Sequence, residues 1–168
     1  LSEIKDIISL PFSKRDLSGN LRFSVRGEVC LYLSTTSYCC AYECRWNDSD
    51  NTKALYVSAF KFNDEGKNLK ILNLTVSEPL INGIGKKNSV CGKNLQCEMI
   101  KIFPLVLATS FVVDNNDKER ERIEYLLSQS LIRVIKKLGV DGVAYLSKQG
   151  EDDFQYPHGV NLALPMGD

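Results

Sequence analysis

One stretch of the chain has a clear helical pattern, and it limits the folds that the chain can adopt. Apolar residues recur at helical spacing over 123–138, at Ile123, Leu126, Leu127, Leu131, Val134, Ile135 and Leu138. Asp117 offers an N-cap for this helix, and Gly139 is placed to end it. After a tight turn at Asp141-Gly142, the segments VAYL (143–146) and VNLAL (160–164) predict two strands. The C-terminal part therefore combines one amphipathic helix with two strands.

The remainder of the chain mixes strands and helices without a regular repeat. Three β-prone segments are predicted to be strands, at residues 29–34, 54–62 and 70–75. Residues 35–46 open with hydroxyl residues suited to an N-cap and predict a short helix. Residues 82–97 indicate a loop, and residues 99–113 fit either a helix or a strand. Because no regular β-α-β order is present, the sequence predicts a single α+β domain.

The charge balance and the apolar runs exclude several classes of protein. Lys and Arg number 21 and Asp and Glu number 21, so the chain lacks the basic excess of a nucleic-acid binder. The longest apolar run, 102–113, contains Pro104 and is too short to span a bilayer. The N-terminus lacks the pattern of a signal peptide and does not begin with Met, so we expect a cytoplasmic domain, either complete or part of a longer protein.

The cysteines and the single histidine do not indicate a metal site. No two of the six cysteines have CxxC spacing, and three of them fall in the helix predicted at 35–46. We therefore expect reduced thiols and no bound metal. His158 lies between Pro157 and Gly159 and is interpreted as a loop residue, not as a catalytic base.

A few polar residues lie where predicted strands and helices meet. Arg22 precedes the first strand, Tyr32 lies in it, Glu43 lies on the following helix and Ser147 follows VAYL. Each has an ordinary explanation: a solvated arginine, a core tyrosine, a surface acid and a loop serine. No glycine-rich phosphate loop, GxSxG or HExxH motif is present. Composition and spacing alone therefore predict an α+β domain and no specific function.

The order of these segments resembles the RES family, which is named after its Arg, Glu and Ser. The matching segments are RFSVRGEVCLYLS (22–34), AYE ending at Glu43, ALYVSAFKF with LKILNLT, EYLLSQSLIRVIKKLGVDGVAYLS, and GVNLAL. The resemblance runs from about residue 11 to residue 165, so residues 1–168 are interpreted as a single RES-like domain. Two departures are visible: no arginine precedes Pro11, where the family usually has one, and Asn73 replaces the aspartate of a "DLT" segment.

The resemblance implies a function in NAD+ consumption. Family members are similar to ADP-ribosyltransferases in fold, a mixed sheet core with flanking helices, and act as toxins that break the nicotinamide–ribose bond of NAD+, their substrate. The acceptor is water, phosphate or a protein, so an NAD+ glycohydrolase or phosphorylase and a protein ADP-ribosyltransferase are both open. A catalytically dead nucleotide-binding module is a third alternative, motivated by the missing arginine. The implied partner is an antitoxin or a larger defence complex, and a homo-oligomer is compatible with the sequence.

The resemblance also assigns roles to individual residues. Glu43 is expected to stabilise the cationic ribose of the transition state, and Arg22 to clamp the pyrophosphate. The catalytic set is completed by Tyr32, which could stack on nicotinamide, and by Ser147. The residues expected to contact the nucleotide are Arg22, Arg26, Tyr32, Gln129 and Ser147.

Overall fold

A four-stranded mixed sheet forms the centre of the molecule. The computed structural model describes residues 9–46, 54–76, 93–112, 122–148 and 157–167. The strands are β1 (Cys30–Ser34), β2 (Ile71–Leu74), β3 (Gly142–Leu146) and β4 (Val160–Pro165), in the order β1-β4-β3-β2. Only the β2–β3 pair is parallel, and the other two pairs are antiparallel. Together with the helices, this sheet confirms the predicted α+β class.

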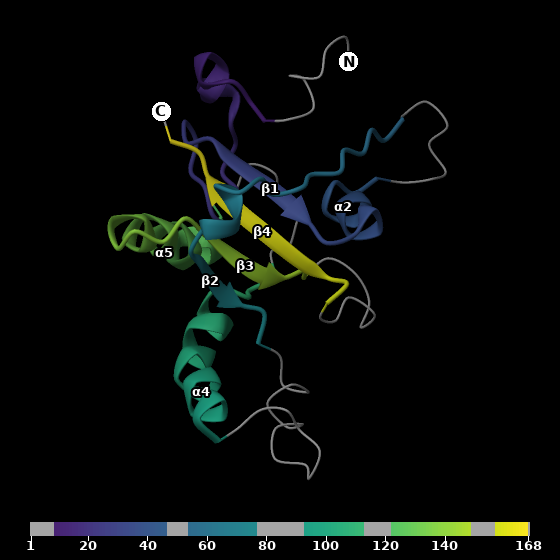
Figure 1. Ribbon diagram of the computed structural model, residues 1–168. Coiled ribbons are helices and arrows are strands. Elements are labelled where there is room, and N and C mark those ends of the chain that lie inside the picture. Colours follow the sequence, from purple (N-terminus) through teal and green to yellow (C-terminus); the bar gives the residue numbers. More distant parts are fainter. Residues whose placement is uncertain (1–8, 47–53, 77–92, 113–121, 149–156, 168) are drawn as a thin grey trace.

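In the described part of the chain, three α-helices and three short 3-10 helices lie around the sheet (Figure 1). Helix α2 (Ser37–Glu43) lies beside β1, and α4 (Lys93–Ala108) lies beside β2 at the opposite edge. Helix α5 (Leu126–Lys137) packs against β3. The 3-10 helices are η1 (Phe12–Leu17), η2 (Gly66–Asn68) and η3 (Ile123–Tyr125). Among the described residues, no helix has the combined length and apolar character needed to cross a membrane.

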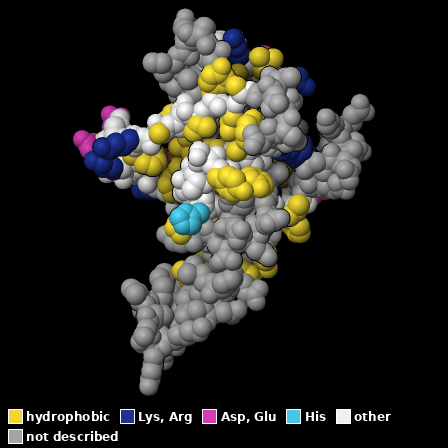
Figure 2. Space-filling model, turned by 90° about the vertical axis from the view of Figure 1, so that its right-hand side faces the viewer, with side chains coloured by type: hydrophobic (Ala, Val, Ile, Leu, Met, Phe, Trp, Pro, Cys, Tyr) yellow, Lys and Arg dark blue, Asp and Glu magenta, His cyan; other side chains and the backbone are white. Residues whose placement is uncertain are grey.

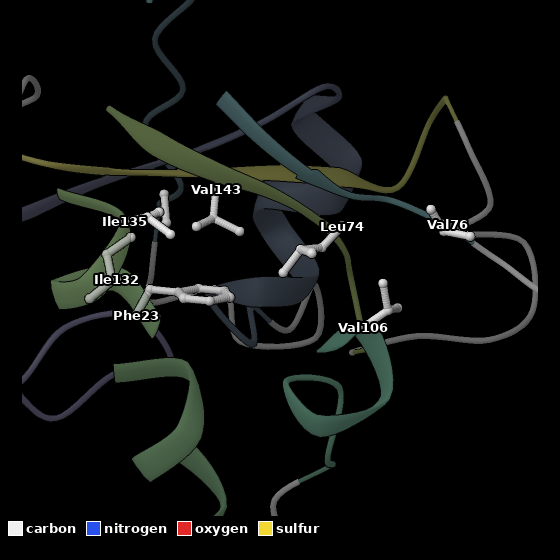
Figure 3. Packing of buried hydrophobic residues seen from close by; sticks show 8 residues of the cluster. Phe23, Leu74, Val76, Val106, Ile132, Ile135 and Val143 are labelled. Carbon is white, nitrogen blue, oxygen red and sulfur yellow. The ribbon is translucent and has the colours of Figure 1, made fainter. Parts of the chain in front are cut away.

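The hydrophobic core lies on the face of the sheet that α5 covers (Figure 3). Ile132 and Ile135 of α5 pack against Val143 of β3, which is fully buried. Phe23 fills the space beneath them and is only 1% exposed. Its ring lies 4.8 Å from that of Tyr145, centroid to centroid. The turn that contains Phe23 is therefore fixed to the core by a large apolar side chain.

The long helix starts later than the sequence predicts. The N-cap candidate Asp117 lies outside the described residues, and the described helical turns are preceded by Arg122, which has a non-helical backbone (φ −81°, ψ 76°). The helical turns begin with η3 and continue directly into α5. The predicted end is confirmed: Gly139 has φ 70°, and Val140 closes the helix by donating to the Ile135 carbonyl.

The turn predicted at Asp141-Gly142 is wrong, because the chain turns at Leu138-Gly139 instead. Asp141 pairs with Lys70 on the neighbouring segment, donating through its N–H and accepting through its carboxylate. Gly142 begins β3, where a Cβ would lie 2.6 Å from the Ala163 carbonyl oxygen. This glycine therefore permits a close approach of two strands and does not serve a turn.

The strand predicted at 54–62 is also wrong. Residues 54–63 form no regular structure, and Tyr56, Phe60 and Phe62 are exposed. The partial alternation of apolar residues predicted a strand, but no neighbouring strand among the described residues pairs with this segment. The strands predicted at 29–34, 70–75, 143–146 and 160–164 are confirmed as β1, β2, β3 and β4.

The ambiguous segment at 99–113 is helical as far as Ala108, in α4, and this helix contains Pro104. The loop predicted at 82–97 is wrong over its last residues, since α4 begins at Lys93, and its other residues lie outside the described part. The short helix predicted at 35–46 is confirmed as α2, with the Thr36 hydroxyl capping it by accepting from the Cys39 N–H at 3.1 Å. The described cysteines are all free thiols.

Candidate active site

Three strands bring polar side chains together at one end of the sheet. Asn161 of β4 is paired with Ser34 of β1 on one side and with Tyr145 of β3 on the other. Directly paired residues on adjacent strands point to the same face, so these three side chains lie in a row. Ser147 follows β3 and is held beside β4 by its N–H, which donates to the Gly159 carbonyl at 2.8 Å. This row lies on the same face of the sheet as the hydrophobic core, at the end of the sheet where the polar side chains gather.

Helix α2 brings Glu43 onto this row. The Glu43 Oε1 atom accepts a hydrogen bond from the Ser147 hydroxyl at 2.6 Å and another from the Asn161 side-chain amide at 2.6 Å. Both are short bonds to an acidic side chain, the stronger class of hydrogen bond. No described residue donates to the other carboxylate oxygen, Oε2. Glu43 is therefore held through one oxygen, while the second is available to a ligand.

Asn161 is itself fixed on all sides. It is 2% exposed, and its Oδ1 accepts from the Ser34 hydroxyl and from the Cys39 thiol. Because Oδ1 is occupied as an acceptor, the amide nitrogen must point toward Glu43. The buried amide thus sets the position of the carboxylate.

A second group of side chains is cationic and gathers on one aromatic ring. The Arg22 guanidinium carbon lies 5.1 Å from the centroid of the Tyr125 ring, and that of Arg122 lies 5.6 Å from the same centroid. Arg22 also donates to the Thr109 carbonyl at 2.7 Å, which fixes its orientation. Burial and the nearby positive charge of Arg22 lower the pKa of Lys148. Two guanidinium groups and an ammonium group thus share one region.

Both groups border a single cavity of about 420 Å³. Arg22, Arg45, Arg122 and Lys148 contribute four cations to its lining, and Glu43 contributes one carboxylate. Tyr32, Tyr125 and Tyr145 supply aromatic surface. This volume is within the range of small-molecule sites, and the lining combines positive charge, flat rings and one oriented acid. Such a cavity suits an anionic ligand with planar groups.

Tyr32 connects this cavity to the core. Its hydroxyl accepts from the Phe23 N–H at 3.1 Å and is hydrogen-bonded to the Ser24 hydroxyl at 3.1 Å. Burial raises the pKa of Tyr32 well above its usual range, so the hydroxyl stays neutral. The hydroxyl holds the turn that contains Arg22, and the residue lines the cavity.

The structure brings together four of the six residues predicted for the site. Arg22, Tyr32 and Glu43 line the cavity, and Ser147 is hydrogen-bonded to Glu43. Arg26 is exposed and does not line it. Gln129 does not line it either, since its amide donates to the carbonyls of Leu21 and Ser24 and so supports the turn that holds Arg22.

Sequence reasoning missed several lining residues: Arg45, Arg122, Tyr125, Tyr145, Lys148 and Asn161. A signal existed for Asn161, because a polar residue in the apolar strand VNLAL implies a buried hydrogen-bonding role. Arg122 follows the charged run DKERE, and such runs usually form a solvated surface. Its position on the Tyr125 ring could only be seen in three dimensions.

Hydrophobic side chains gather at the surface on the side of the molecule where α2 lies, the side that faces the viewer in Figure 2. Tyr38 and Tyr42 are exposed on α2, and their rings meet edge to face with centroids 4.9 Å apart. Trp46, just beyond the helix, is also exposed. The helix that holds Glu43 therefore presents aromatic surface to solvent.

Comparison with known proteins gives one distant relationship. No protein-family model matches the chain, and no solved structure matches it. The chain is 28% identical over 150 residues to a Bacillus subtilis (strain 168) protein named "Putative toxin YopC". The match covers 86% of this chain and 33% of that protein, so the chain spans about a third of the length of the curated relative that it matches.

Proposed function

We propose that this chain is an NAD+-cleaving toxin domain of the RES type, with an ADP-ribosyltransferase-like fold. The observation that carries the proposal is the oriented carboxylate of Glu43 in a cavity whose other charged residues are all cationic. The name of the relative in Bacillus subtilis supports the toxin part of the proposal. The reaction breaks the bond between nicotinamide and ribose.

The carboxylate fits the charge that develops in this reaction. When the C–N bond breaks, its electron pair leaves with nicotinamide, which becomes neutral, and the positive charge moves to the ribose ring. The free Oε2 of Glu43 would stabilise this charge, which is largest in the transition state. An acceptor oxygen then bonds to the ribose carbon and loses its proton. Ser147 and Asn161 keep Glu43 in place without neutralising it.

The cationic group fits the other half of the substrate. The pyrophosphate of NAD+ carries two negative charges, and guanidinium groups bind phosphate through paired donors. Arg22 is oriented by Thr109 and by the Tyr125 ring, so its conformational freedom is already reduced before binding. The RES family usually has a second arginine upstream of Pro11, which this chain lacks. Arg122, on the same ring as Arg22, would take its place.

A toxin requires a neutralising partner, and the exposed aromatic residues near Glu43 fit one. Tyr and Trp are enriched at the centres of protein interfaces. A protein that covered Tyr38, Tyr42 and Trp46 would contact the helix that carries Glu43. Such an antitoxin could therefore act at the site itself.

The proposal is tested by incubating the chain with NAD+ and measuring nicotinamide by liquid chromatography, with and without added phosphate. Glu43→Gln should lower nicotinamide release at least ~100-fold, because it removes the charge while its oxygen can still accept both hydrogen bonds. Glu98→Gln is the matched control, since it loses only an exposed ion pair to Lys101 on α4. The co-product identifies the acceptor as water, phosphate or protein.

Equal turnover by Glu43→Gln and the wild-type chain would contradict the assignment of Glu43. Binding of NAD+ with no release of nicotinamide would instead identify a nucleotide-binding module. Circular dichroism spectra of both variants should match that of the wild-type chain.

A further inference from the structure

Arg45 adopts a backbone conformation that favours glycine. It follows α2 with φ 52°, and the other described residues with positive φ are Gly27 and Gly139. Its N–H donates to the Tyr42 carbonyl, and the next N–H, of Trp46, donates to the Ala41 carbonyl. This pair of bonds is a Schellman closure, in which the residue at the position of Arg45 is usually glycine. A residue with a Cβ is strained there.

The location of Arg45 offers a reason for this strain. Arg45 lines the cavity two residues after Glu43, and its side chain makes no hydrogen bond or ion pair with any described residue. Backbone strain that a glycine would remove, but that the sequence keeps, is often found at functional sites.

The electrostatics at the end of α2 call for a cation if an anion is to bind there. The last carbonyls of a helix carry partial negative charge, and the carboxylate of Glu43 adds a full one. Both would repel the phosphates of a nucleotide. The other three cations of the cavity come from other segments: Arg22 and Arg122 lie on the Tyr125 ring, and Lys148 lies near Arg22.

We propose that Arg45 binds a phosphate group of the substrate, as a specificity-determining residue of the cavity. The inference rests on the proposed function for the identity of the ligand, a dinucleotide with two phosphates. Arg22 and Arg122 hold one part of the pyrophosphate, and Arg45 holds the part nearest α2. Arg45 acts in binding and takes no part in bond cleavage.

The experiment compares Arg45→Gly with the wild-type chain in two measurements that should change in opposite senses. Glycine relieves the strain, so the melting temperature should rise by about 2 °C. Affinity for ADP-ribose, which retains the pyrophosphate and lacks the scissile bond, should fall at least ~10-fold. Trp46, the only tryptophan, reports binding through its fluorescence. Arg45→Asn repeats the loss of charge with a residue that tolerates positive φ.

Arg133→Gln is the control, because it removes an arginine that does not line this cavity and loses only an exposed ion pair with Glu28, so the affinity of this variant for ADP-ribose should equal that of the wild-type chain. If Arg45→Gly is more stable and binds ADP-ribose as well as the wild-type chain, the role of Arg45 is refuted while the proposed function stands. If the wild-type chain binds inorganic pyrophosphate but not ADP-ribose, and Arg45→Gly weakens that binding, Arg45 is supported and the NAD+ proposal fails. Binding of neither ligand by the wild-type chain would refute both.

Discussion

Asn161 is the residue on which the geometry of the site depends most. Its amide group connects β1, α2 and β4 through Ser34, Cys39 and Glu43. Asn161→Asp would place a second carboxylate against Glu43, and two carboxylates in contact do not both ionise near neutral pH. We therefore expect nicotinamide release at pH 7 to fall at least ~10-fold and to recover in part as the pH rises. A pH–rate profile measures this.

The thermal stability of Asn161→Asp gives a second test that does not depend on activity. The difference in melting temperature from the wild-type chain should widen from pH 4 to pH 8, because the unfolded variant ionises both carboxyl groups above about pH 4, whereas the folded variant keeps one of them protonated. Asn73→Asp is the control: its Oδ1 accepts from the N–H and the hydroxyl of Thr75, and a carboxylate oxygen can do the same. A constant difference across the pH range would argue against contact between the two carboxylates.

At the scale of the elements, the contact between β3 and β4 depends on Gly142. A Cβ at this position would lie 2.6 Å from the Ala163 carbonyl oxygen and 2.6 Å from Leu164 Cδ2. Since the first of these atoms belongs to the backbone, Gly142→Ala should force the strands apart and destabilise the fold by about 2–3 kcal/mol. Urea unfolding would measure this loss, and Gly19→Ala is the control, because no atom lies within 4 Å of its added Cβ. Equal losses in the two variants would contradict the close approach.

The elements also show how far local sequence patterns predict this fold. The strands with strong apolar patterns and the helix ended by Gly139 were predicted correctly, because their side chains are buried on a consistent face. Residues 54–62 have a similar pattern and form no strand, since strand formation depends on a neighbouring strand that local sequence does not reveal. Gly142 was assigned to a turn because an Asp-Gly pair favours one, whereas its role depends on Ala163, distant in sequence.

At the scale of the whole molecule, the charge of the chain and the charge of its cavity differ. The formal net charge is zero, but the cavity has four cations and one acid in its lining. The sequence pointed to Arg22 and Glu43 through resemblance to a family, and both residues line the cavity. It could not show that Arg45, Arg122 and Lys148 join them, because these residues come from separate segments that only the folded sheet brings together.

Partly buried thiol and phenol groups with raised pKa values make the folded chain sensitive to alkali. Burial raises the pKa of Cys30 to about 12, and burial is also the main reason that the pKa values of Tyr32 and Tyr145 lie well above their usual range. In the unfolded chain these thiol and phenol groups ionise near pH 8.5 and 10, respectively. Their neutral forms therefore stabilise the fold fully below about pH 8, and this contribution is lost as the pH rises from there toward the folded-state values.

The free energy of unfolding in urea should accordingly be similar at pH 7 and pH 8 and should fall steadily between pH 9 and pH 11. Cys30→Ala removes one of these groups, so the decrease between pH 8 and pH 10 should be smaller than in the wild-type chain, although the variant is less stable at pH 7. Cys97→Ala is the matched control, because that thiol is exposed and the dependence on pH should not change. A wild-type stability that stayed constant up to pH 11 would mean that these groups ionise as readily in the folded chain as in the unfolded one.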